Sequence, residues 1–222
     1  MSIVEQTEAS DAMFMGGPRD AEILYDDVTG LPRFSLFRTQ VKEIIKDSPS
    51  KNLEAALVAF DLANFKAYNR QYGFSAGDDL LRKLGTLIGK EFPEQPVMRF
   101  VEDRFYVFSM LPDVKERITR LHSDVRELKN SKSVHLKVGI YMLTDPGEEL
   151  SLAMDMARLA CDSIKGREGF YYRIYDDEFD RDFVLERHIV DHIDEAIQKR
   201  WIEVWYQPVA RAQTGRICGF EA

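Results

Sequence analysis

The stretch Leu53-Glu-Ala-Ala-Leu-Val-Ala-Phe60, followed by Asp61-Leu-Ala-Asn-Phe-Lys-Ala-Tyr-Asn69, decides the fold. Its first part is a short and nearly continuous apolar run, which is typical of a β-strand that is buried on both faces. Asp61 comes where this run stops, and strand ends are where open α/β sheets place their ligand sites. The stretch therefore predicts a buried strand that leads into a candidate binding site.

Working outward from this strand, helical and extended patterns alternate along the chain. A turn at Asp26–Pro32 precedes a helix whose apolar face begins at Phe34, and further amphipathic helices are expected over about 78–90, 114–128 and 152–164. Strands are expected over 97–100, 105–110, 136–143 and 170–175, the first two paired around a turn at Val101–Arg104. This order argues for an α/β sandwich in which helices cover a mixed sheet.

Composition fits an ordinary globular protein. The 222 residues carry a net charge of −8 and 45% hydrophobic residues, so a core can form and no overall basic field would attract nucleic acid. The two cysteines, Cys161 and Cys218, lack metal-ligand spacing and fit a reducing compartment. No apolar run approaches about 20 residues, and the N-terminus does not read as a signal peptide. A cytoplasmic location is expected.

Two segments resemble the nucleotide site of GGDEF domains, the bacterial diguanylate cyclases that join two GTP into cyclic di-GMP. They are Asp61–Asn69, with Gly73 and Gly77-Asp78 following, and Arg99-Phe-Val-Glu-Asp-Arg-Phe105. The resemblance covers about residues 22–176. It implies an α/β (α+β) fold with a central, mostly antiparallel sheet of about five strands flanked by helices. The name-giving Gly-Gly-Asp-Glu-Phe reads Val101-Glu-Asp-Arg-Phe105 here.

The metal ligands that the family would use are largely replaced. A strand-end Asp, matched by Asp61, and a hairpin Glu would hold Mg²⁺, but the Glu is Arg104 and a further family Asp is Ala63. A cation about 4 Å from a divalent ion is repelled by a few kcal/mol even at an effective dielectric constant of about 20. We therefore expect no diguanylate cyclase activity. Asp61 is then a weak metal ligand at most, or an end-of-strand acid that caps the next turn.

Nucleotide-binding residues match the family better than the metal ligands do. The resemblance implies that Asn69 and Asp78 read the guanine edge and that Phe65 and Lys66 lie in the turn whose amides contact phosphates. Arg104 could hold phosphate oxygens in place of the metal, through the paired donors of its guanidinium. The alternative is that Asp78 is only a helix N-cap and Asn69 only a turn residue.

Three further family positions bear on the site. Lys165 falls where the family has a phosphate-gripping lysine, but the following Gly166-Arg167 come two residues early, so we expect a solvated loop lysine. The product-inhibition motif Arg-x-x-Asp would fall on Phe92–Gln95 and is absent. Phe105 matches the last motif residue, so a register slip that brings Glu102 or Asp103 into the place of Arg104 is not expected.

The remainder divides into a leader at residues 1–21 and a second region from 177 to 222. That region is expected to hold an acidic-ended helix, a strand at Trp201–Tyr206 and a hairpin turn at Thr214–Arg216. Its end, Gly219-Phe-Glu-Ala222, resembles the first motif of EAL phosphodiesterase domains, in which Glu221 would bind the catalytic metal. We expect a regulatory domain that modulates a downstream EAL domain, with GTP as its candidate ligand. The alternatives are a non-binding scaffold that dimerises or spaces its neighbours and, last, a residual cyclase.

Overall fold

The structure is a computed structural model that describes residues 24–47, 55–128, 133–143, 145 and 147–222. Contacts divide the chain after Asp176 into two units, of which the first carries the candidate site. The expected leader, residues 1–21, lies outside the described residues, as do Leu53 and Glu54 at the start of the apolar run.

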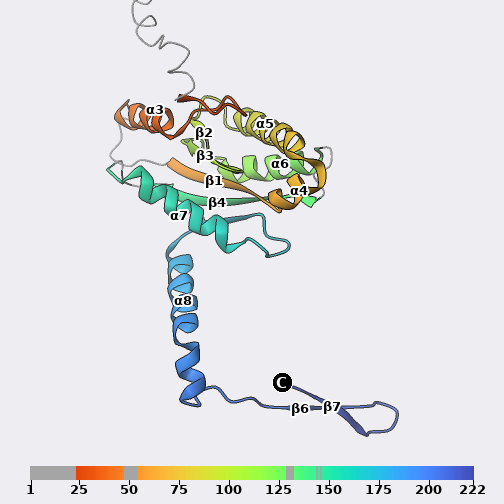
Figure 1. Ribbon diagram of the computed structural model, residues 1–222. Coiled ribbons are helices and arrows are strands. Elements are labelled where there is room, and N and C mark those ends of the chain that lie inside the picture. The colour runs from red at the N-terminus through yellow and green to blue at the C-terminus, as the bar shows by residue number, and fades with distance from the viewer. Residues whose placement is uncertain (1–23, 48–54, 129–132, 144, 146) are drawn as a thin grey trace, which may run out of the picture. The chain divides into compact units, whose positions relative to one another are not determined.

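The first unit is built on a five-stranded sheet with the order β2-β3-β1-β4-β5 (Figure 1). Its strands are β1 (Ala55–Ala63), β2 (Val97–Val101), β3 (Arg104–Ser109), β4 (His135–Leu143) and β5 (Tyr172–Tyr175). The β4–β5 pair is parallel, and the other three pairs are antiparallel. The mixed, mostly antiparallel sheet of about five strands is therefore confirmed.

Helices cover both faces of this sheet (Figure 1). One core cluster joins the sheet to α4 (Phe65–Tyr72), α5 (Phe74–Glu91) and α6 (Val114–Arg126). The other cluster joins the opposite face to α3 (Phe34–Asp47) and α7 (Leu150–Ser163). The two apolar layers explain why the central strand has no polar residue before Asp61.

Successive side chains of β1 alternate between the two layers. Val58 and Phe60 pack toward α5 and α6, whereas Leu57 and Ala59 pack toward α3 and α7. By this alternation Asp61 points to the α7 face. The strand does not stop at Asp61, as the sequence suggested, but continues to Ala63, because β4 pairs with it over that whole length.

Gly139 lets α7 lie directly on β4. A Cβ at Gly139 would stand 1.9 Å from the Ala157 carbonyl oxygen and 2.4 Å from the Cys161 amide nitrogen, so only glycine allows this close approach. The buried Cys161 thiol donates to the Lys137 carbonyl oxygen at 3.4 Å on the same strand. The close contact fixes where the last turn of α7 ends, and this turn supplies a wall of the candidate site.

The second unit contains α8 (Asp177–Gln198) and a hairpin of β6 (Gln207–Ala210) and β7 (Ile217–Glu221). The expected turn is confirmed, since Thr214 and Gly215 both donate to the Arg211 carbonyl oxygen. The strand expected at Trp201–Tyr206 is wrong, because the ladder begins only at Gln207. Among the described residues, no helix combines the length and the apolar character needed to cross a membrane.

Candidate functional site

Asp61 and Arg104 face each other where β1 and β3 run side by side. Phe60 pairs with Phe105 in the antiparallel ladder, so the next step of the ladder brings Asp61 opposite Arg104. Both side chains point to the α7 face of the sheet, and the distance from Arg104 Nη2 to Asp61 Oδ2 is 3.6 Å. The two sequence motifs therefore meet at one place, as the resemblance implied.

Lys165 completes a network of four charges. Its Nζ lies 2.7 Å from Asp61 Oδ2 and 2.8 Å from Asp162 Oδ1, while Arg104 Nη2 lies 3.6 Å from Asp162. Lys165 lies in the turn after α7 and is partly exposed, as expected, but its ammonium is not simply solvated, because it pairs with Asp61 and Asp162. Asp162 was missed in the sequence. Its position three residues before Lys165 at a helix end was the signal that could have found it.

The network holds its two cations, Lys165 and Arg104, in their charged forms. Burial alone would lower the pKa of the Lys165 ammonium, but its hydrogen bonds to Asp162 and Asp61 outweigh burial, and the pKa is raised. Burial likewise opposes the charge of Arg104, and the neighbouring Tyr106, Asp162 and Asp61 raise the pKa of the guanidinium. Two cations and two carboxylates thus neutralise one another within the site.

The hairpin between β2 and β3 turns through Glu102 and Asp103. Glu102 has the left-handed conformation, with φ of 53°, and Val101 ends β2 without a positive φ. Phe105 keeps the expected register, and Asp103 accepts a hydrogen bond from the Leu62 amide at 3.1 Å. Burial, followed by repulsion from Asp61, raises the pKa of the Asp103 carboxyl. Asp103 therefore fastens the hairpin to β1.

Arg99 also holds this hairpin in place, by hydrogen bonds to its backbone. Its guanidinium donates twice to the Glu102 carbonyl oxygen, at 2.9 and 2.6 Å, and binds Asp26 at 2.9 Å. Asp26 in turn accepts from the Thr29 amide and hydroxyl, which closes the turn before α3. The side chains of Arg99 and Asp26 are only 13% and 12% exposed, so this contact is a structural support for the motif loop.

A cavity of about 480 Å³ opens at this strand end. Its lining includes Asp61, Arg104 and Lys165, and also Phe65 and Lys66, the two residues expected at the phosphate turn. Phe65 is buried, whereas Lys66 is exposed and lies 3.8 Å from Glu102. Phe65 and Lys66 begin α4, so their amides belong to a helix N-terminus, where backbone donors suit anions.

Asn69 and Asp78 do not line that cavity, but the structure draws their segments together. Asn69 is in α4 and Asp78 in the second turn of α5, so the alternative N-cap and turn assignments are wrong. A Cβ at Gly77 would stand 1.9 Å from Asn69 Oδ1, which shows how closely the amide lies over α5. Asn69 Oδ1 is buried and accepts no hydrogen bond from the described residues.

The residues at the strand end do not fit Mg²⁺. The ion needs several oxygen ligands in near-octahedral arrangement. Asp61 Oδ2 is already bonded to Lys165, the hairpin position presents Arg104, and Ala63 has no side-chain ligand atom. Within the described ranges, no three or more His, Cys, Asp or Glu side chains are grouped to hold a metal.

Comparison with known proteins agrees with the two motifs and the sheet order. The family described as "Diguanylate cyclase, GGDEF domain" matches residues 23–169, which is well over half of the chain. This chain belongs to the GGDEF family. The GGDEF domain of DgcB from Caulobacter crescentus, solved with c-di-GMP, superposes with a TM-score of 0.58 at 18% identity, covering 68% of this chain and 95% of that one.

Curated relatives extend the match beyond the GGDEF domain. MucR of Pseudomonas aeruginosa, a bifunctional diguanylate cyclase/cyclic di-GMP phosphodiesterase, is 22% identical over 90% of this chain and 30% of its own length. PdeB of Shewanella oneidensis, a cyclic di-GMP phosphodiesterase, is 25% identical over 83% of this chain and 22% of its own. The chain thus spans less than a third of these relatives.

Proposed function

We propose that this is a catalytically inactive GGDEF domain that serves regulation in a bacterial cyclic di-GMP signalling protein. The observation that carries the proposal is the network of Arg104, Lys165, Asp61 and Asp162. A cyclase needs carboxylates that are free to take up metal and positive charge that is free to meet a triphosphate. Here the opposite charges satisfy each other, and the second carboxylate position is Ala63.

The regulated partner in this proposal is an EAL phosphodiesterase domain that follows in the chain. Support comes from the resemblance at Gly219–Ala222 and from relatives whose names include cyclic di-GMP phosphodiesterase. Glu221, which would bind the metal of a complete EAL domain, is the exposed last residue of β7 and pairs with Gln207.

The absence of cyclase activity is tested by incubating the protein with GTP and Mg²⁺ and separating the nucleotides. We expect no cyclic di-GMP. Arg104→Glu alone should not restore turnover, because Lys165 still forms an ion pair with Asp61 and the hairpin turn lacks both glycines of the motif. The GGDEF domain of a relative with an intact motif, assayed in parallel, is the positive control. Robust turnover by the unmodified protein would overturn the proposal.

The regulatory ligand in this proposal is GTP, held at its guanine by Asn69 and Asp78. Asn69 Oδ1 is buried and has no hydrogen-bond partner in the part of the chain that the structure describes, which favours this assignment, since buried polar atoms normally have a partner that the occupied site would supply. Titration calorimetry should give saturable, guanine-specific binding that Asn69→Ala abolishes. Gln71→Ala, at an exposed position of the same helix, is the matched control and should bind normally.

In this mode Arg104 replaces part of the missing metal charge. GTP binding should then be largely independent of Mg²⁺, and Arg104→Ala should weaken it by roughly 1.5 to 3 kcal/mol, the usual size for a hydrogen bond to a charged group. Affinity that rises steeply with Mg²⁺, or that ignores the loss of Arg104, would show that the arginine has no part in binding.

The alternative is a scaffold that binds no nucleotide and only dimerises or spaces its neighbours. The observation that favours it is that Arg104 and Lys165 are already ion-paired with the two carboxylates. No heat of binding on titration with GTP, together with a concentration-dependent dimer in sedimentation, would support the scaffold. In the complete protein, GTP that changes the rate of cyclic di-GMP hydrolysis would support the regulatory binder.

A further inference from the structure

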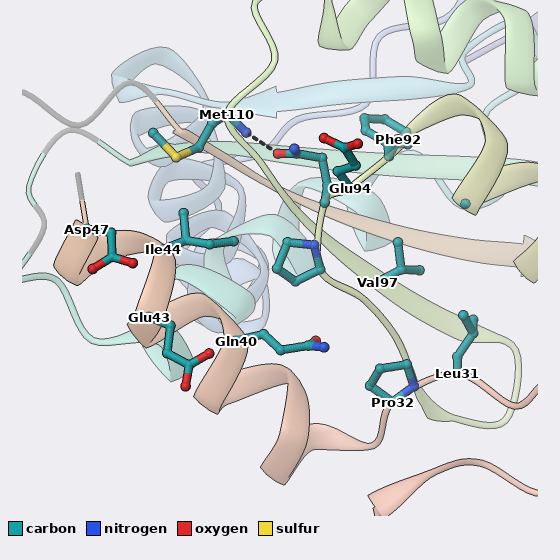
Figure 2. Close-up of a pocket in the computed structure, with 13 residues that line it drawn as sticks. Leu31, Pro32, Gln40, Glu43, Ile44, Asp47, Phe92, Glu94, Val97 and Met110 are labelled. Carbon is teal, nitrogen blue, oxygen red and sulfur yellow. Dashed lines mark hydrogen bonds between the residues drawn. The ribbon is translucent and has the colours of Figure 1, made fainter. Parts of the chain in front are cut away.

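A further cavity, of about 900 Å³, lies between α3 and the segment that joins α5 to β2 (Figure 2). Its lining includes Phe92, Glu94 and Gln95, from the segment where the family's product-inhibition motif would fall, but none of the guanine, phosphate-turn or charge-network residues described above. Its size is in the range of cavities that bind small molecules and peptide side chains.

The floor of this cavity is apolar. Phe92, Pro96 and Val97 are buried at its base, and Leu31, Ile44 and Met110 line it while partly open to solvent. Figure 2 shows the α3 residues on one side and Phe92, Glu94 and Val97 across from them. Such a floor suits an apolar side chain of an incoming molecule, because burying that side chain removes apolar surface from water.

The rim is acidic. Glu43 and Asp47 lie along α3, one turn apart, and Glu94 stands on the opposite wall; all three are exposed. None of the 13 lining residues is Lys, Arg or His. Among the described residues no salt bridge joins a cation to these three carboxylates, which leaves them open to a cation from another molecule.

One further acceptor faces the same region. Figure 2 shows the Gln40 side chain extending from α3 toward the floor, and its Oε1 is buried without a hydrogen-bond partner among the described residues. A buried amide oxygen of this kind is normally satisfied, and a peptide N–H or a lysine ammonium supplies the missing donor.

We propose that this cavity, formed by α3 and residues 89–97, docks a basic, apolar segment of a partner protein. The charges decide against two other occupants. The chain's own first 23 residues carry Glu5, Glu8, Asp11, Asp20 and Glu22 against one basic residue, Arg19, and a second copy carries the same net charge of −8. The partner segment inserts an apolar side chain over Phe92 and sets lysine or arginine against the rim.

Two labelled short peptides test the proposal by fluorescence anisotropy: one alternates leucine with lysine, and the other alternates leucine with glutamate. The lysine peptide should bind the protein saturably, more weakly at 1 M salt than at 0.1 M because screening shortens the reach of the rim charges. The glutamate peptide and cyclic di-GMP, both anionic, should not compete. Equal binding of both peptides, or no saturable binding of either, would overturn the proposal.

Variants separate docking in the cavity from general attraction to an acidic protein. Glu43→Lys with Glu94→Lys should weaken the lysine peptide at least tenfold, about 1.4 kcal/mol. Glu116→Lys with Glu127→Lys makes the same charge change at α6, whose contacts are with the other face of the sheet, and should change affinity less than about twofold. Equal losses of peptide affinity in the two double variants would mean that only the net charge of the protein matters, and would overturn docking in the cavity.

Gly89→Phe tests insertion without altering charge. Gly89 lines the cavity, and a Cβ there meets no atom within 4 Å, so a side chain can start from this position without a clash at its Cβ. Replacing a helical glycine also favours α5. With unchanged circular dichroism, the variant should lose peptide binding at least tenfold; unaltered binding would place the peptide outside the cavity.

Discussion

Replacing Asp61 with Asn should destabilise the nucleotide-free domain, because the carboxylate is the shared partner of two cations. Asp61 is only 6% exposed, and its Oδ2 lies 2.7 Å from Lys165 and 3.6 Å from Arg104. Asn keeps the shape and an acceptor oxygen but removes the charge. Lys165 and Arg104 then share Asp162 alone and repel each other.

The size of the effect follows from those distances. At an effective dielectric constant of about 20, the two attractions are about 6 and about 5 kcal/mol, gross values that dehydration of the carboxylate largely cancels. Lys165 is also 35% exposed, which screens part of its attraction. A net loss of about 2 kcal/mol is therefore expected, the usual worth of a charge-assisted hydrogen bond.

Urea unfolding followed by far-ultraviolet circular dichroism measures this loss. With a slope of about 2 kcal/mol per molar, the midpoint should fall by about 1 M. Asp155→Asn, which removes an exposed partner of Arg158, is the control and should change stability by less than about 0.5 kcal/mol. A true metal site reverses the sign, because ligand carboxylates repel one another without metal. A neutral or stabilising Asp61→Asn would therefore refute the charge network.

The other predictions concern close contacts and pH. Gly77→Ala should displace the Asn69 amide, cost about 1 to 3 kcal/mol of stability and abolish any GTP binding seen by calorimetry. Gly139→Ala meets backbone rather than a side chain, so it should cost about 3 kcal/mol or more and lower the melting temperature further than Gly77→Ala does. Asp103 has a raised pKa, so the stability it contributes is full below pH 3.8 and falls as pH rises through its folded-state pKa. Asp103→Asn should therefore remove that fall in urea titrations across acidic pH, leaving stability at pH 7 equal to or above that of the parent.

Much of the fold could be predicted, because a strand that is buried on both faces has a recognisable, nearly continuous apolar sequence. The apolar run before Asp61 fills both core layers, and the amphipathic helices recur between strands. Helix limits were less accurate. α5 begins at Phe74 rather than near Asp78, because Gly73, with φ of 86°, breaks the chain between α4 and α5 and lets the second helix start at once.

The contacts that define the site were harder to predict, because they depend on where distant elements end. Lys165 reaches Asp61 across 104 positions of sequence, and its direction depends on the seating of α7 over Gly139. The error at Trp201–Tyr206 has a different cause. Aromatic residues favour strands, but among the described residues the ladder with β7 begins at Gln207, which pairs with Glu221, and Trp201–Tyr206 take no part in it.

The charge network also limits how a nucleotide can be held. A phosphate that enters the 480 Å³ cavity must compete with Asp61 and Asp162 for Arg104 and Lys165, so each new attraction replaces one that already exists. Because the net electrostatic gain is the difference between the two, phosphates alone add little affinity. Discrimination must then come from the guanine side, where Asn69 Oδ1 has no competing partner among the described residues. Under the proposed function, the domain would recognise the base without setting up the phosphates for reaction, as a regulatory nucleotide site requires.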